Sequence, residues 1–467
     1  MKGSLFRKKD IYKVRDVGAH DKLEKVLGPV DLVAMGIGTI MGTGIFVLTG
    51  IQAATFSGPA VIISLALAAL AALFIALMYT EIASAIPSSG GSYTYTYVVV
   101  GEMAAFLVGF IYIFQAGCAI PAIASGWGGY FVGALKQLNI NLPDALTKTP
   151  FEGGVINIPA MSICLIMTAV LIRGVKESAT LNIILVFIKL FVVFLFIAIA
   201  FPHFKLSNWD NFMPFGFKGV SISAGVLFFA YNGFDAVANA AEECKNPSRD
   251  ITIGLIGSLV FCAVIYILIA AMLTGIVHYT KLNTSEALAY ALKANGSNIG
   301  GAIVAAGGIA GITTVVLFQL YSLTRVLMAM SRDRLLPTIF SKIHKKYHTP
   351  YVGTIFCGIT TAIIAGLFPI SILGSLSSLS ILIILLIIVM ATMYLRKTRP
   401  KLKRPFRCPA IYLVGTIAIL CCMYLLFGLI QHVGKIFIWF VILGIIMYFT
   451  YSKKRVDRCA KRQAVKD

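Results

Sequence analysis

The chain has 467 residues, of which 58% are hydrophobic and 13% are charged, whereas soluble domains are about half apolar and a quarter charged. So few polar residues cannot cover a surface in water, which excludes an ordinary soluble enzyme and predicts a protein with several membrane-spanning helices. The net charge of +21 does not indicate nucleic acid as a partner, because the basic residues lie between or outside the apolar runs.

The first element, residues 1–29, is basic and polar. Because so long a polar segment precedes the first apolar run, we expect no cleavable signal peptide. Residues 1–25 mix basic and apolar positions, and two interpretations remain open: an amphipathic helix on the cytoplasmic leaflet, or a disordered tail.

Twelve apolar runs come next, each long enough to span a membrane, and they predict an all-α integral membrane protein with 12 transmembrane helices. The first six spans are expected at 30–54, 59–86, 99–134, 155–172, 180–201 and 219–241. The second six are expected at 251–277, 299–331, 350–368, 373–395, 409–431 and 434–451.

The distribution of Lys and Arg predicts the orientation of these spans. Both residues are concentrated in the N-terminal segment, the even-numbered loops and the tail 452–467, and they are sparse in the odd-numbered loops. Retained segments are enriched in Lys and Arg, so we expect both termini in the cytoplasm. The segments between spans are too short to hold a separate soluble domain.

The first span contains four glycines at membrane depth, Gly36, Gly38, Gly42 and Gly44. Glycine costs about 1 kcal/mol relative to alanine in a helix interior, so we expect the helix to unwind near Gly42–Gly44. Hydrocarbon penalises unpaired amides, and an unwound turn must therefore line a polar cavity, where its N–H groups suit an anion such as a carboxylate. Close packing between helices is the alternative, and the glycines alone do not decide.

The sixth span contains Asn232, Gly233 and Asp235 within an apolar run. Asn and Asp favour turns and caps, so we expect a second break, with Asp235 as the cap of a restarted half-helix and a role as a ligand as the alternative. The two breaks lie in the first helix of two blocks of five spans, which is the pattern of a transporter site between inverted repeats. Amides on one side and carbonyls on the other suit a zwitterion.

Lys189 lies deep within the fifth span, too far from either end for its side chain to reach the interface. Intramembrane ionisable groups commonly mark ion or proton pathways, and desolvation favours the neutral form of an amine. We therefore expect Lys189 to bind and release a proton, with a permanently charged structural ammonium as the alternative. Thr313 and Thr314 in the eighth span are candidate neighbours.

The sequence predicts no metal site, structural disulfide or enzyme active site. The nine cysteines show no metal spacing and none lies in a predicted external loop, so neither a metal site nor a structural disulfide is predicted. Glu81 and Glu102 lie near helix ends, where capping or orientation is the expected role, and Cys118 has no His at membrane depth to activate it. The chain is therefore not expected to be an enzyme or to hold a cofactor.

Several motifs appear in an order that resembles the amino acid-polyamine-organocation superfamily, in particular bacterial members similar to cationic amino acid transporters. The matching stretches are Gly36 to Phe46, Pro87 to Tyr95, Phe229 to Asp235 with Glu242 and Glu243, Asn246 to Asp250, and Ser331 to Pro337. The resemblance implies a leucine-transporter-like fold of two inverted five-helix repeats, 30–201 and 219–395. The basic loop 396–408, two additional helices at 409–451 and the basic tail 452–467 complete the chain.

The resemblance also implies the roles of individual residues. The substrate carboxylate would meet amides at Thr43 and Gly44 beside Ile40, while the amino group would meet carbonyls of Phe229 and Ala230. Asn232 would line the side-chain pocket. Lys189 would take the place that sodium holds in other members, facing Gly38, Met41, Ala310, Thr313 and Thr314.

One position departs from the pattern of that branch. Gln115 stands in the third span where many members carry an acidic residue. If that acid favours cationic side chains, neutral Gln115 weakens the case for arginine or lysine as substrate.

These features predict a proton-coupled symporter of L-amino acids in the cytoplasmic membrane, with the proton and membrane lipid as further partners. An exchanger or a polyamine or amine carrier on the same fold is the alternative, and a non-transporting amino acid sensor is a third interpretation.

Overall fold

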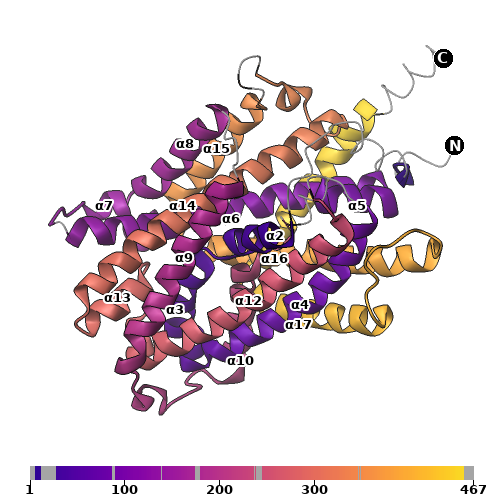
Figure 1. Ribbon diagram of the computed structural model, residues 1–467. Coiled ribbons are helices and arrows are strands. Elements are labelled where there is room, and N and C mark those ends of the chain that lie inside the picture. The colour runs from indigo at the N-terminus through magenta and orange to yellow at the C-terminus, as the bar shows by residue number, and fades with distance from the viewer. Residues whose placement is uncertain are drawn as a thin grey trace, which may run out of the picture.

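The computed structural model describes residues 6–11, 28–86, 90–137, 139–173, 179–235, 237, 244–344, 347 and 349–456, and its elements are all helices (Figure 1). Those of the first part are α2 (Pro29–Ile40), η2 (Gly44–Leu48), α3 (Thr49–Gln52), η3 (Ala53–Ser57), η4 (Gly58–Ala60), α4 (Val61–Ala85), α5 (Gly91–Val99), α6 (Glu102–Gln137), α7 (Asp144–Thr147), η5 (Pro150–Glu152), α8 (Ile158–Arg173) and α9 (Ala179–Ala200).

Helices also make up the second part of the described chain. They are η6 (Phe201–His203), η7 (Leu206–Trp209), α10 (Gly216–Leu227), η8 (Phe228–Tyr231), α12 (Pro247–Ile276), η10 (Tyr279–Lys281), α13 (Ala287–Ala294), α14 (Asn298–Arg332), η11 (Thr338–Ser341), α15 (Tyr351–Leu367), α16 (Ile370–Thr398), α17 (Ile411–Met447) and η12 (Tyr448–Ser452).

Seven helical segments in the described residues are long and apolar enough to cross a membrane. They are Gly44–Ala85, Glu102–Lys136, Val186–His203, Arg249–Ile276, Asn298–Arg332, Ile370–Thr398 and Ile411–Val456. Four shorter apolar helices accompany them, Pro29–Ile40, Ile158–Arg173, Gly216–Tyr231 and Tyr351–Leu367. The predicted spans fall on these segments, which confirms a multi-pass helical membrane protein.

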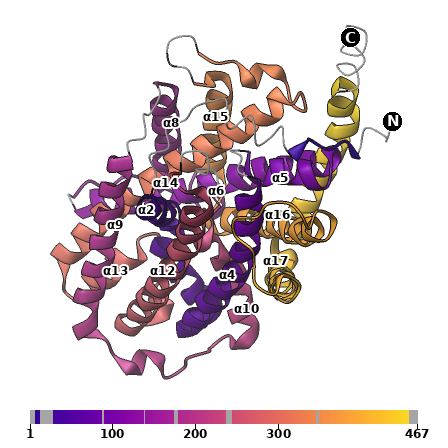
Figure 2. The ribbon, with the colours of Figure 1, turned by 45° about the vertical axis from the view of Figure 1, so that its right-hand side comes forward.

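The central helix is α2, which lies in the middle of the bundle in both views (Figures 1 and 2) and packs against α9 and α12. The long helix α6 packs against α8, α14 and α16, while α12 also covers α4. Segments distant in sequence are thereby brought to both sides of the short helix that ends at Ile40.

Charged groups from several segments gather at one end of the bundle, which we call the basic face. There Lys9 binds Asp333 at 2.6 Å, beyond the end of α14. Lys8 lies 5.5 Å from the ring of Tyr394 near the end of α16, and Arg455 donates to the carbonyl of Leu336.

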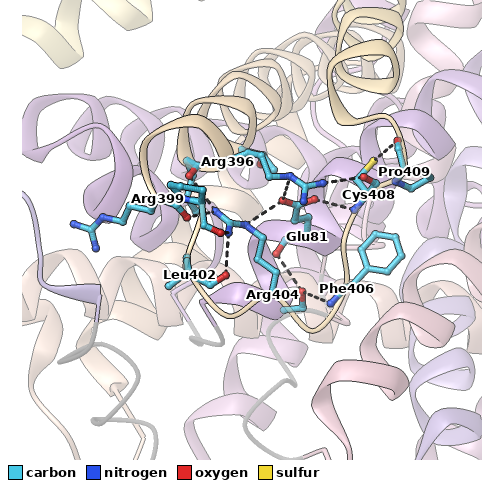
Figure 3. A network of polar contacts seen from close by, with 12 residues as sticks. Glu81, Arg396, Arg399, Leu402, Arg404, Phe406, Cys408 and Pro409 are labelled. Carbon is cyan, nitrogen blue, oxygen red and sulfur yellow. Dashed lines mark hydrogen bonds and ion pairs between the residues drawn. The ribbon is translucent and has the colours of Figure 1, made fainter.

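At this face, ion pairs and hydrogen bonds connect the segment between α16 and α17 to Glu81 of α4 (Figure 3). Glu81, which is 1% exposed, lies 3.2 Å from Nε of both Arg396 and Arg404 and accepts a 2.8 Å bond from the backbone N–H of Cys408. The guanidinium of Arg404 also donates to the carbonyl of Leu395 in the last turns of α16. Glu81 therefore orients this segment, in keeping with the role expected for a carboxylate near a helix end.

Two parts of the helical structure add detail to the predicted spans. The predicted spans 409–431 and 434–451 both fall largely within α17. The contacts reverse along this stretch: Gly415 packs against α16 near the basic face, His432 packs against η3 at the opposite end, and Tyr448 of η12 donates a hydrogen bond to Glu102, the first residue of α6. A further buried helix, α5, lies in the stretch between the second and third predicted spans.

Candidate functional site

The first predicted break is present. Helix α2 ends at Ile40, Met41 is extended with φ −78° and ψ 93°, and helical structure resumes at Gly44 as η2. The break begins at Met41, slightly before the predicted position. Since the first amides of a helix have no partner within it, the start of η2 offers donors at the centre of the bundle.

The second predicted break is present as well. Helix α10 passes into η8, Asn232 is extended with ψ 138°, and Gly233 has φ +111°. That positive φ favours glycine, because a side chain would be strained there. The proposed cap by Asp235 concerns a half-helix that falls largely outside the described residues.

The two breaks meet. A Cβ atom on Gly44 would lie 2.4 Å from Cα of Ala230, so only glycine permits this approach. The hydroxyl of Thr39 donates to the carbonyl of Gly233 at 3.0 Å, which joins the two interrupted segments directly. The sequence-predicted residues Thr43, Gly44, Phe229 and Ala230 are therefore brought together.

Neighbouring helices hold the predicted residues of the first break in place. The carbonyl of Ile40 accepts a 2.9 Å hydrogen bond from Tyr266 of α12. The hydroxyl of Thr43 donates to the carbonyl of Ile123 in α6 at 3.2 Å. The side chain of Thr43 is thus engaged by α6, and it is the backbone of this residue that remains for a ligand.

Lys189 is buried in α9, with 1% of its surface exposed, and its ammonium donates to the carbonyl of Gly38 at 2.7 Å. In the part of the chain that the structure describes, this is its one hydrogen-bond partner. An ammonium has three donors, so a charged Lys189 with a single acceptor carries a desolvation cost that a neutral amine does not.

Of the other predicted neighbours of Lys189, two take part in different hydrogen bonds. Thr314 donates to Gly311 at 2.8 Å, and Thr313 donates to Ile309 and accepts from Trp127, also at 2.8 Å. Gly311 packs directly against the Lys189 stem, since a Cβ there would lie 3.1 Å from Cγ of the lysine. Ala310 adjoins this glycine in α14, and Met41 is buried at the end of α2.

A cavity adjoins the breaks on the side of the basic face. It is small and partly open to solvent. It shares Gln115 and Asn232 with the predicted site, and Gln115 is held by a 3.0 Å hydrogen bond to Ser377 in α16. The complete lining is Thr39, Tyr112, Gln115, Asn232, Gly233, Asp235, Val315, Phe318, Gln319 and Ser322.

Sequence reasoning missed the contribution of α14 to this cavity. Val315, Phe318, Gln319 and Ser322 are spaced at i, i+3, i+4 and i+7, which places them on one helix face. Two polar residues on one stripe of an apolar span were the available signal. Among the described residues, no group of three or more His, Cys, Asp or Glu side chains could hold a metal ion.

Comparisons with known proteins agree over nearly the whole chain. A family model described as amino acid permease matches residues 27–454. The branched-chain amino acid permease BcaP of Bacillus subtilis is 43% identical over 462 residues, covering 97% of this chain and 99% of that protein. The methylthioribose transporter of the same organism is 42% identical over 453 residues, covering 97% and 98%. Cationic amino acid transporter 5 of Arabidopsis thaliana is 34% identical over 368 residues, 78% of this chain and 64% of that protein.

Proposed function

Because this chain belongs to the amino acid permease family, within the amino acid-polyamine-organocation superfamily, we propose that it is a proton-coupled symporter of L-amino acids. Its relatives are named permeases and transporters, so the chain is a membrane transport protein and not an enzyme. The coupling ion, the side-chain preference and the orientation belong to the proposal.

The proposed architecture has twelve spans arranged as two inverted five-helix repeats and two further helices. The interruptions after Ile40 and at Asn232 support it, since they fall at corresponding places in the two proposed repeats. The reversal of contacts along α17 supports two crossings in that segment. We assign the basic face to the cytoplasm, on the positive-inside rule.

The proposed substrate site lies where the two breaks meet. Backbone amides at Thr43 and Gly44, at the start of η2, would bind the carboxylate, and carbonyls of Phe229 and Ala230, at the end of η8, would bind the amino group. Ile40 borders the site through a backbone held by Tyr266.

The single observation that carries the coupling proposal is the hydrogen bond from Lys189 to Gly38. It joins α9 to the half-helix that precedes the substrate amides, and it depends on a group that can gain or lose a proton. Protonation would bind α2 to α9 more strongly, because charged hydrogen bonds are stronger than neutral ones. Release of the proton would free α2 to move, which links the proton to alternating access.

The free energy of proton entry is large enough to drive accumulation of an amino acid. One proton moving through about 100 mV supplies about 2.3 kcal/mol, and a gradient of one pH unit adds about 1.4 kcal/mol. Together they support accumulation of a neutral amino acid by several hundredfold.

The test is transport by purified protein in liposomes. Uptake of labelled amino acids is measured with an inward proton gradient and, separately, as counterflow without a gradient. The proposal predicts concentrative uptake that collapses when a protonophore is added. Counterflow without proton-driven accumulation would instead assign an exchanger. Methylthioribose belongs in the same panel because of the relative's name, and its transport in place of any amino acid would contradict the proposed substrate class.

A further inference from the structure

The loop between α16 and α17 carries more positive charge than nearby carboxylates can balance. Residues 396–408 contain seven Lys and Arg side chains and no Asp or Glu, and the sequence has no acidic residue at positions 334–456. In the described chain Glu81 of α4 reaches this loop, and its carboxylate is shared by Arg396 and Arg404. The loop therefore keeps a net positive charge after these ion pairs have formed.

The backbone of this loop is ordered by its own contacts. Arg404 is 6% exposed, and its guanidinium donates to four backbone carbonyls in the loop and in the last turn of α16. Pro400, Pro405 and Pro409 fix the backbone φ angle at three positions. Because the backbone is already ordered, little conformational freedom is lost when the exposed charges of the loop bind an anion.

Four exposed cations project from the end of α16 and from this loop. They are Lys397, Arg399, Lys401 and Arg407, which we call the loop cations. The ion pairs with Glu81 are made by other arginines of the segment, and Figure 3 shows the side chain of Arg399 pointing away from Glu81. The loop cations are therefore presented to the surroundings of the protein.

Aromatic side chains place the loop cations at the membrane surface. Tyr394, one turn before the end of α16, is 51% exposed, and Tyr412, the second residue of α17, is 54% exposed. Tyr is enriched at the membrane–water interface at the ends of spans. Lys397 follows Tyr394 by three residues, which is about 4.5 Å along the helix axis. This is within the distance of about 8 Å over which charges interact at physiological ionic strength.

We propose that the loop cations form a binding site for the phosphate headgroup of an anionic phospholipid in the leaflet at the basic face. A phosphodiester supplies the negative charge that the loop lacks, and Lys and Arg donate strong hydrogen bonds to phosphate oxygens. The acyl chains of the lipid lie against apolar side chains of α17, beginning with Leu413, which is 64% exposed. A zwitterionic phospholipid carries its own cation, which cancels much of the attraction. The site therefore distinguishes lipids by the net charge of the headgroup.

The experiment measures lipid binding to the full chain in an uncharged detergent by native mass spectrometry. Phosphatidylglycerol and phosphatidylcholine with identical acyl chains are titrated separately, and the measured quantity is the ratio of their dissociation constants. The wild type should bind phosphatidylglycerol more tightly by about tenfold or more, and each cation removed should weaken this binding by about fivefold. A loop variant that removes all four charges should bind both lipids equally. Its substitutions are Lys397→Gln, Arg399→Gln, Lys401→Gln and Arg407→Gln.

A matched control variant removes four charges from exposed lysines at the opposite end of the bundle. Its substitutions are Lys136→Gln, Lys205→Gln, Lys218→Gln and Lys281→Gln. The control variant has the same net charge as the loop variant and should keep the wild-type ratio. Melting temperatures measured without added lipid show whether both variants are folded.

Loss of the preference for phosphatidylglycerol in the loop variant alone supports the lipid site. Equal binding of the two lipids by the wild type overturns the proposal, and so does an unaltered preference in a folded loop variant. An equal loss of preference in both variants also overturns it, because the preference then follows the net charge of the protein. These outcomes do not depend on whether the chain transports amino acids.

Discussion

The side-chain nitrogen of Lys189 on α9 lies 2.7 Å from the carbonyl oxygen of Gly38 on α2. That carbonyl precedes the break at Met41 by one turn of helix, so the bond connects a titratable group to the half-helix that leads to the substrate amides. Because no second hydrogen bond holds the lysine in the described chain, the strength of this link depends directly on the protonation of one nitrogen.

Lys189→Ala should remove the stimulation of uptake by external acid. Without the amine there is no group at Gly38 to receive the proton, so uptake should be independent of pH between about 5 and 8 and should no longer exceed equilibration. Initial uptake rates at several pH values check this. Lys218→Ala, which alters an exposed lysine in α10, should keep the wild-type profile; an acid-stimulated Lys189→Ala would reject the coupling role.

Gly44→Val should abolish substrate binding while the protein remains folded. A side chain at this position would collide with the backbone of Ala230, and it would separate the amides from the carbonyls of the proposed site. Binding is measured by calorimetry and folding by size-exclusion chromatography. Gly117→Ala is the matched control, because a Cβ there meets no atom within 4 Å; normal affinity in Gly44→Val would contradict the site assignment.

Tyr266→Phe should weaken substrate binding about fivefold. The substitution removes the hydroxyl that bonds the carbonyl of Ile40 at 2.9 Å, and a buried hydrogen bond of this kind contributes about 1 kcal/mol. We expect the loss in affinity because the bond fixes the last residue before the break. Equilibrium binding of the preferred substrate tests this, and an affinity equal to the wild type would show that α12 does not position the break.

Glu81→Gln should destabilise the protein. Glu81 is the carboxylate that faces both Arg396 and Arg404, and removing one partner of a buried ion pair costs about 3 to 5 kcal/mol. The melting temperature in detergent should fall by several degrees. Asp144→Asn breaks an exposed pair with Lys148 and should leave the melting temperature unchanged. Equal melting temperatures for both variants would show that the Glu81 cluster adds no stability.

The helix breaks and the need to pair a buried charge were predictable from the sequence, because they follow from the preferences of individual residues. The cluster of four glycines in the first span and the Asn232–Gly233 pair both disfavour a continuous helix, so both breaks could be placed to within a few residues. An internal partner for Lys189 was also predictable, because a charged side chain within a membrane-spanning helix is costly unless it pairs with a group inside the protein. That Gly38 is this partner came from the family resemblance and not from the physics of the sequence.

The cavity and the Glu81 cluster were not predictable, because they depend on how the helices are oriented and packed against one another. The cavity needs the face of α14 bearing Gln319 to point at Asn232, which single-span periodicity cannot determine. The Glu81 cluster needs a loop more than 300 residues later in the chain to fold back onto α4. The helical backbone of α17 through His432 and Gly434 was not predictable either, because these two residues mark a boundary between apolar runs without determining whether the helix is interrupted there.

The most direct test of the proton-coupling claim is proton flux measured beside substrate flux. Liposomes loaded with a pH-sensitive dye and held at zero membrane potential receive the preferred amino acid without an imposed pH gradient. Coupling through Lys189 predicts that the lumen acidifies as substrate enters through the wild type, and that Lys189→Ala admits substrate without acidification. Substrate entry through the wild type with no change in internal pH, or equal acidification by both proteins, would contradict it.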